Sequence, residues 1–145
     1  MAIQTMRLIA DSDLCRDCQA CTLACSLYHE GQCGPSLARL RVLKDMEHYR
    51  FQILICRQCD EPACMAACPN QALRLNEWGV PVIYQDECLL CGACQTACPY
   101  GALFYHQASG RYLKCDLCSG RERGPVCAEV CPVGAIVVEG LEVPA

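Results

Sequence analysis

Cysteine dominates this sequence, with 17 copies in 145 residues. Sixteen of them fall into four groups of four, and only Cys33 stands outside the groups. In every group two residues separate the first two cysteines and three residues separate the last two. The groups are Cys15, Cys18, Cys21 and Cys25; Cys56, Cys59, Cys64 and Cys68; Cys88, Cys91, Cys94 and Cys98; and Cys115, Cys118, Cys127 and Cys131. Thiolates at such spacings indicate metal binding or redox chemistry.

The C-x2-C-x2-C-x3-C spacing of the first and third groups predicts iron–sulfur sites. Three thiolates within seven residues can reach three corners of an iron–sulfur cube from one tight loop. In proteins with two cubes, the fourth cysteine of such a run ligates the other cube. Pro69, Pro99 and Pro132 directly follow the last cysteine of three groups, where proline fixes the exit of the chain.

Zinc is the main alternative, because four thiolates suit zinc as well as iron–sulfur clusters. Zinc ligands usually come as two separated C-x2-C pairs, and a single tetrahedral ion makes poor use of three cysteines packed into seven residues. The three C-x3-C-P endings also favour iron–sulfur clusters. A disulfide scaffold is the least favoured alternative, since thiols stay reduced in the cytoplasm, where we expect this protein.

Length, charge and hydropathy exclude several other classes. A chain of 145 residues suffices for one domain that buries about 70% of its unfolded surface. The net charge of −4 argues against a nucleic-acid partner. The first ten residues lack the apolar run of a signal peptide, and the charge-free run 88–110 is a cysteine loop, not a membrane span. We therefore expect a soluble, cytoplasmic protein.

The cysteine groups lie within a repeated pattern of short elements. Residues 68–73, 98–103 and 131–136 all read C-P-x-x-A-[L/I]. Turn residues predict two hairpins, and a third pair of strands is expected between the first two groups. The expected strands are 73–75 with 80–84, 103–106 with 111–114, and 38–44 with 51–55. Helical turns should be short and lie just after the third cysteine of each loop.

Over essentially the whole chain the pattern resembles the four-cluster ferredoxin-type electron-transfer subunits of molybdenum and tungsten pterin oxidoreductases. The resemblance rests on the four-residue gap within 56–64, on the sequence Lys114-Cys115-Asp116-Leu117-Cys118, and on Gly124-Pro125 ahead of Cys127. One departure is that no proline follows Cys25. The resemblance implies an α+β fold, a duplicated bacterial-ferredoxin-like arrangement of short strands and helices around four 4Fe-4S clusters.

The same resemblance implies a single polyferredoxin domain over residues 1–145. Its outer module would come from groups 15–25 and 115–131, and its inner module from groups 56–68 and 88–98. In the family, paired groups exchange their last ligand. Transferred to this sequence, cluster 1 takes Cys15, Cys18, Cys21 and Cys131; cluster 2 takes Cys56, Cys59, Cys64 and Cys98; cluster 3 takes Cys68, Cys88, Cys91 and Cys94; and cluster 4 takes Cys25, Cys115, Cys118 and Cys127.

Four thiolates on every cluster leave no open iron, so we expect electron transfer alone and no catalytic residue. Basic side chains beside ligands stabilise reduced clusters, and Arg16, Arg57 and Lys114 are candidates. A solvated surface charge is at least as good an interpretation of each of the three. The histidines lack ligand spacing, and Cys33 is expected to be a spare thiol.

The expected function is a non-catalytic subunit that relays single electrons through four 4Fe-4S clusters. It would connect a tungsten- or molybdenum-pterin catalytic subunit with a second redox partner such as a flavin subunit. Small size and the segment 25–29 most resemble the iron–sulfur subunit of tungsten-containing aldehyde oxidoreductases. A free soluble polyferredoxin, or a subunit of formate dehydrogenase or dimethyl sulfoxide reductase type, is the alternative. A zinc-bound interaction module is a more remote alternative. Self-association into an electron-conducting chain is a further hypothesis.

Overall fold

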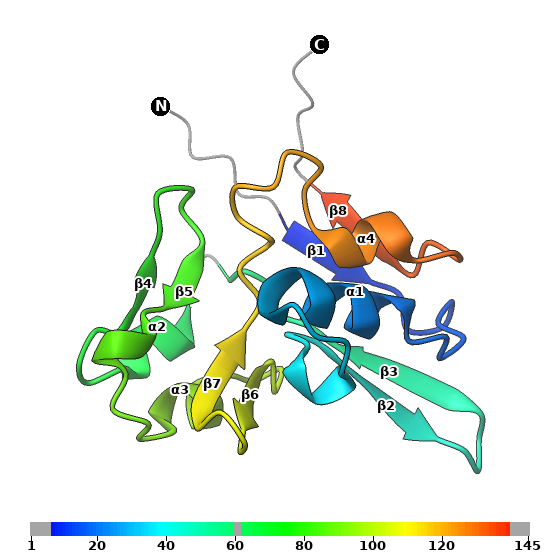
Figure 1. Cartoon of the computed structure of the whole chain (residues 1–145). Helices are drawn as coiled ribbons and strands as arrows, with labels where there is room; N and C mark the ends of the chain where they lie inside the picture. The colour runs from blue at the N-terminus through cyan, green and yellow to red at the C-terminus, as the bar shows by residue number, and fades with distance from the viewer. Residues whose placement is uncertain (1–6, 60–61, 140–145) are drawn as a thin grey trace.

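The computed structural model describes residues 7–59 and 62–139, and its strands form four separate two-stranded antiparallel sheets (Figure 1). The pairs are β1 (Arg7–Ala10) with β8 (Ile136–Glu139), β2 (Arg41–Asp45) with β3 (Arg50–Leu54), β4 (Leu73–Leu75) with β5 (Pro81–Ile83), and β6 (Leu103–His106) with β7 (Arg111–Lys114). Pairing of β1 with β8 brings the two ends of the described chain side by side.

Three of these sheets are the two predicted hairpins and the third predicted pair of strands. Strands β6 and β7 have the predicted bounds, and β5 is one residue shorter at each end than predicted. Strand β2 begins at Arg41 and not at residue 38, because Ala38 and Leu40 are packed in the core ahead of the ladder. The sheet of β1 and β8 was not predicted, since no turn signal links segments from opposite ends of a sequence.

Four α-helices carry cysteines of the four groups. They are α1 (Ala20–Glu30), α2 (Ala63–Ala67), α3 (Ala93–Ala97) and α4 (Val126–Val130), with single 3-10 turns at η1 (Pro35–Leu37) and η2 (Gln85–Glu87). Helices α2, α3 and α4 are short, as predicted, but they contain the third cysteine where they were expected to follow it. Helix α1 is longer because no proline follows Cys25, and it ends at Gly31 in the left-handed conformation.

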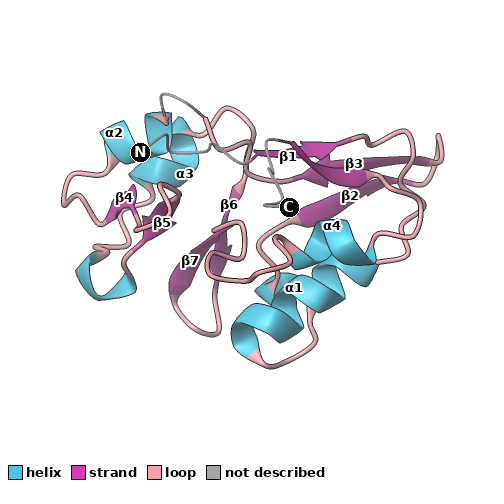
Figure 2. Ribbon diagram, turned by 90° about the horizontal axis from the view of Figure 1, so that it is seen from above, coloured by secondary structure: helices cyan, strands magenta, loops and turns pink. Residues whose placement is uncertain are grey.

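The helices pack as two pairs, α1 against α4 and α2 against α3 (Figure 2). Each pair joins distant parts of the chain: α1 and α4 carry cysteines of the first and fourth groups, and α2 and α3 those of the second and third. The hairpin of β2 and β3 extends away from the helices (Figure 1).

Cysteines form a large part of both buried clusters of side chains. Leu40, Ile136 and their aliphatic neighbours pack with Cys21, Cys25, Cys115 and Cys127. A smaller cluster joins Leu73 and Leu103 to Cys64, with Cys68, Cys94 and Cys98 packed against it. Because thiols are part of both clusters, a group bound by them would contribute directly to the stability of the fold.

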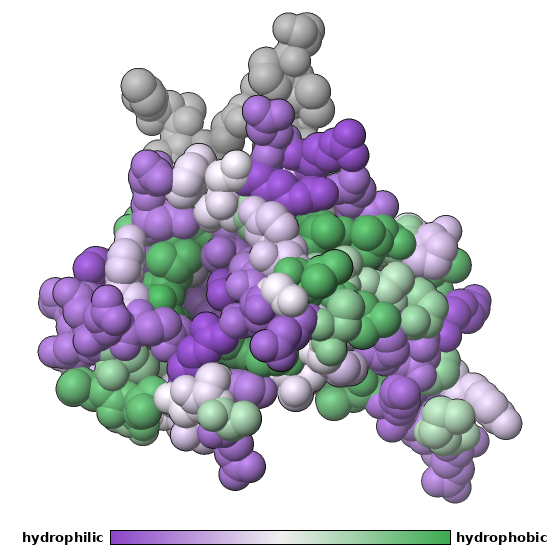
Figure 3. All heavy atoms as spheres, in the orientation of Figure 1, coloured by the Kyte–Doolittle hydropathy of each residue, from purple (hydrophilic) through white to green (hydrophobic). Residues whose placement is uncertain are grey.

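The surface seen in Figure 3 carries apolar side chains over α1 and α4. On α1, Leu23, Leu27 and Tyr28 are exposed, and Val133 is exposed after α4. Within the ranges described here, no helix has the length and apolar character needed to cross a bilayer.

Candidate metal centres

The four cysteine loops share one backbone conformation. The residue just before the second cysteine lies in the left-handed region in every loop, at Asp17 (φ 58°), Gln58 (φ 50°), Leu90 (φ 57°) and Leu117 (φ 56°). Each such non-glycine residue costs of order 1–3 kcal/mol, and such strain gathers at functional sites. Four repetitions of the same strained turn indicate that the four groups share one local architecture.

The C-P-x-x-A-[L/I] repeats fold into turns that direct backbone N–H groups at the last cysteine. The alanine and the following residue are buried in all three: Ala72 and Leu73, Ala102 and Leu103, Ala135 and Ile136. The N–H of Ala135 lies 3.3 Å from Cys131 Sγ. Burial raises the pKa of Cys131, but its backbone N–H partners outweigh burial and lower it. The same balance lowers the pKa of Cys68, so the turn favours a thiolate at these two residues.

Cys25 obtains its N–H partner differently because its group lacks the proline turn. Helix α1 continues through it, and the backbone N–H that points at Cys25 Sγ comes from Arg39, at 3.2 Å. Backbone donors near the sulfurs stabilise negative charge there, which is a known determinant of iron–sulfur potentials.

Thiols of the first and fourth groups are electrostatic neighbours. Burial raises the pKa of Cys21 to about 11, and repulsion from Cys131, of the fourth group, adds to that of Cys15 and Cys18. Burial likewise raises the pKa of Cys127 to about 12. Repulsion from Cys118 of its own group and from Cys25 and Cys21 of the first adds to this rise. Each of these two groups therefore has the last cysteine of the other beside it.

The second and third groups are related in the same way. Burial raises the pKa of Cys64, and Cys56 and Cys98 add to the shift. Burial also raises the pKa of Cys94, whose thiol neighbours are Cys88, Cys64 and Cys68. Cys98 of the third group thus lies with the second, and Cys68 of the second lies with the third.

A small hollow marks the second group. Its lining includes Cys56, Cys59, Cys64, Cys98 and Lys114. All seventeen cysteines are free of disulfides. Four thiolates in a largely apolar surrounding match the donor set of a 4Fe-4S cluster, so the residues present fit the group that the sequence predicts.

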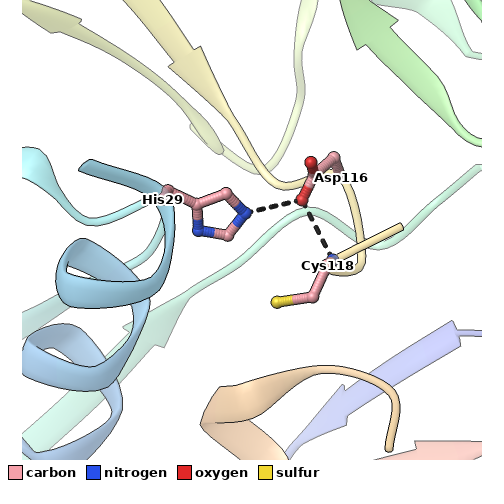
Figure 4. A group of neighbouring side chains, drawn as sticks. All are labelled: His29, Asp116 and Cys118. Carbon is pink, nitrogen blue, oxygen red and sulfur yellow. Dashed lines mark hydrogen bonds and ion pairs between the residues drawn. The ribbon is translucent and has the colours of Figure 1, made fainter. Parts of the chain in front are cut away.

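His29 is a site residue that was not predicted from the sequence (Figure 4). Its Nδ1 lies 3.0 Å from the carbonyl oxygen of Cys25 and 3.6 Å from Cys25 Sγ. Its Nε2 lies 2.8 Å from Oδ1 of Asp116, which also accepts the backbone N–H of Cys118 at 3.0 Å. Residues four apart lie on the same face of a helix, so a helix predicted through residues 25–29 would have placed His29 beside Cys25.

The surroundings of His29 favour its charged form. Carbonyl and carboxylate oxygens only accept, so both ring nitrogens donate. Burial by itself lowers the pKa of His29, but hydrogen bonds to Asp116, Cys118 and Cys25 outweigh burial and raise it to about 12. Burial raises the pKa of Asp116, but the bond to His29 and the charges of His29 and Arg39 lower it overall.

The three basic residues beside expected ligands have different environments. Arg16 is exposed and donates to the carbonyl oxygens of Asp13 and Cys15. Arg57 is exposed and its guanidinium lies 4.6 Å from the ring centroid of Tyr100. Lys114 is only 5% exposed. The interpretation as a solvated charge is therefore wrong for Lys114, while it suits Arg16.

A hollow of about 430 Å³ lies between the loop of the first group and the hairpin of β2 and β3. Cys15 is in its wall, and Cys18 is exposed nearby in the sequence. The first group is therefore within reach of a molecule that binds at this surface.

Comparison with known proteins agrees with this geometry. The family model of the 4Fe-4S dicluster domain matches residues 47–140, and a 4Fe-4S binding domain matches residues 12–28. The chain belongs to the 4Fe-4S dicluster domain family. Iron–sulfur binding is thereby favoured over the zinc alternative.

Two relatives from Escherichia coli (strain K12) are similar along most of their length. YsaA, a proposed electron transport protein, is 37% identical over 89% of this chain and 86% of its own. A subunit of anaerobic dimethyl sulfoxide reductase is 33% identical over 87% of this chain and 69% of its own. The names of these relatives confirm the prediction of a non-catalytic electron-transfer protein.

Among solved structures, a chain of the active-site complex BamBC of benzoyl-coenzyme A reductase is similar in fold. It superposes with a TM-score of 0.59 at 29% sequence identity, covering 97% of this chain and 79% of that chain. The structural similarity covers nearly the whole chain, whereas the model of the dicluster family matches residues 47–140.

Proposed function

We propose that this chain is an electron-transfer subunit that holds four 4Fe-4S clusters and relays single electrons between a pterin-containing catalytic subunit and a second redox partner. The observation that carries the proposal is that the last cysteine of each group is an electrostatic neighbour of thiols in its partner group. Cys131 lies with the first group and Cys25 with the fourth, and Cys98 and Cys68 are exchanged in the same manner. One zinc ion per group would need no such exchange.

The proposed ligands are the four sets named from the sequence, with Cys33 outside them. Cluster 1 would bind Cys15, Cys18, Cys21 and Cys131; cluster 2 Cys56, Cys59, Cys64 and Cys98; cluster 3 Cys68, Cys88, Cys91 and Cys94; and cluster 4 Cys25, Cys115, Cys118 and Cys127. Electrostatic interactions of Cys21, Cys64, Cys94 and Cys127 with other members of their sets support the assignment. The two helix pairs then define the outer and inner modules of one duplicated domain.

Each bound 4Fe-4S cluster supplies one-electron oxidation and reduction. The residues of the chain hold the thiolates, exclude water and place donors near the sulfurs. Backbone N–H groups of Arg39, Ala102 and Ala135 point at Cys25, Cys98 and Cys131. Burial of Ala102 and Ala135 keeps two of these donors in a dry surrounding, where their effect on charge is larger than in water.

The proposed catalytic partner is a tungsten- or molybdenum-pterin subunit, of aldehyde oxidoreductase type in the first instance, acting with a flavin subunit in the cytoplasm. The relative that is a subunit of dimethyl sulfoxide reductase and the similarity to a chain of BamBC support a place in a larger oxidoreductase. The apolar side chains Leu23, Leu27 and Tyr28 on α1 offer surface for such contact.

Metal and sulfide analysis of anaerobically purified protein tests the proposal. We expect about sixteen irons with matching acid-labile sulfide per chain, from four cubes of four. Zinc without sulfide would overturn the redox function. Size-exclusion chromatography of the native extract tests the partner: elution with a large pterin-containing subunit is expected, whereas elution alone or as an extended oligomer would favour a free polyferredoxin or self-association.

A further inference from the structure

Lys114 is a cation in the interior with only neutral partners among the described residues. Its Nζ donates to the carbonyl oxygen of Pro81 at 2.6 Å and to that of Cys115 at 3.1 Å. No carboxylate of residues 7–59 or 62–139 forms an ion pair with it, although arginines such as Arg39 and Arg111 have acidic partners. Burying an ammonium group without a counter-charge is strongly unfavourable, and a negative charge close to Lys114 in the functional protein would offset this cost.

Cysteines of two groups lie close to Lys114. Lys114 lines the hollow of the second group together with Cys56, Cys59, Cys64 and Cys98. It also directly precedes Cys115 of the fourth group and is hydrogen-bonded to that residue's carbonyl oxygen. Burial raises the pKa of the Cys64 and Cys115 thiols, and the charge of Lys114 opposes the rise in both.

The position of Lys114 relative to the two helix pairs determines which cysteine groups its charge can affect. The second group lies on the α2–α3 pair and the fourth on the α1–α4 pair, and β7, which ends at Lys114, contacts β5 between them. Lys114 therefore bridges β5, which carries Pro81, and the loop of the fourth group.

We propose that Lys114 is a positioning residue whose ammonium is the shared counter-charge of the clusters at the second and fourth groups and makes both easier to reduce. The inference rests on the proposed function, because the counter-charge acts on bound clusters. A reduced cluster carries one more negative charge than an oxidised one, and a nearby cation in a medium of low dielectric favours the reduced form.

Redox titration of the loaded protein, followed by electron paramagnetic resonance, tests the inference. Lys114→Met keeps the aliphatic stem and removes the charge, and Lys114→Arg keeps a charge. Arg123→Met is the matched control, because it also removes one positive charge but from a side chain that is 79% exposed. At fixed potential, we expect Lys114→Met to lower the reduced-to-oxidised ratio of two clusters about tenfold, which is about 59 mV for a one-electron couple. Lys114→Arg and Arg123→Met should titrate like the wild type.

Iron and sulfide content is measured first on every protein. Zinc or missing sulfide in the wild type would overturn the proposed function itself. Full cluster content together with unchanged potentials in Lys114→Met would overturn only the role of Lys114. If Lys114→Met loses clusters, the iron content of Lys114→Gln and Lys114→Arg distinguishes a role of the charge from a role in packing. Loss of iron in Lys114→Gln alone supports a role for the charge, and loss in both variants overturns it in favour of packing.

Discussion

The imidazole of His29 lies 2.8 Å from the carboxylate of Asp116, a residue 87 positions further along the chain. This contact joins the end of helix α1 to the loop of the fourth cysteine group, beside Cys25 and Cys118. Arg39 extends the contact, with its guanidinium 3.5 Å from the same carboxylate. The network therefore ties together the two segments that would have to share one cluster.

Replacing His29 by glutamine should weaken this tie. The Asp116 carboxylate is largely buried and would lose its hydrogen-bonded cationic partner, so we expect a loss of about 1–3 kcal/mol in the free energy of unfolding. The denaturant midpoint for loss of the visible cluster absorbance, measured anaerobically, reports the change. His48→Gln is the control, because His48 pairs with Asp45 at the surface and should contribute less than about 1 kcal/mol. Equal effects of both variants would contradict the prediction.

The same ion pair predicts a dependence of stability on pH. Because folding raises the pKa of His29 from 6.5 to about 12, its stabilisation is complete below pH 6.5 and is lost as pH rises toward 12. Folding lowers the pKa of Asp116 from 3.8, so its contribution is present above pH 3.8 and is lost as pH falls below it. The midpoint difference between wild type and His29→Gln should therefore be larger at about pH 6 than at about pH 10. A gap that does not change between these two pH values would show that the imidazolium charge is not responsible.

Serine substitutions test the proposed exchange of ligands. Cys25→Ser and Cys127→Ser should each remove the same paramagnetic signal, and about four of about sixteen irons, because both residues are assigned to cluster 4. Cys33→Ser should keep every signal, since Cys33 is exposed and outside the four groups. If Cys25→Ser instead abolished the signal lost in Cys18→Ser, the first group would hold its own cluster and the exchange would be wrong.

Gly92 should resist substitution for two separable reasons. It has φ 76°, and an added Cβ would lie 3.0 Å from the hydroxyl oxygen of Tyr112. Gly110 also has positive φ, at 64°, but an added Cβ there meets no atom within 4 Å. We expect Gly110→Ala to cost about 1–2 kcal/mol from backbone strain, and Gly92→Ala to cost more. Denaturant midpoints measure both, and Tyr112→Phe should recover part of the extra loss in Gly92→Ala; no recovery would exclude the contact with the hydroxyl.

Local features were predictable because their cause lies within a few residues. The hairpin of β6 and β7 follows from short strand segments on either side of a turn at 107–110. The buried Ala135 and Ile136 follow from the C-P-x-x-A-[L/I] repeat. The bounds of α1 were not predicted, since the helix continues where a proline is absent after Cys25. This longer helix places His29 against the fourth group.

The order of residues was enough to predict the cysteine groups, their chemistry, two hairpins with a third pair of strands, and the class of protein, because spacing along a chain sets which thiolates one loop can present. It could not predict that Lys114 is buried while Arg16 and Arg57 are exposed, although all three stand next to a cysteine. The contact of His29 with Asp116 and the pairing of β1 with β8 likewise became known only from the folded chain. These outcomes depend on which distant segments pack together, and packing sets the desolvation and the charge that a side chain experiences.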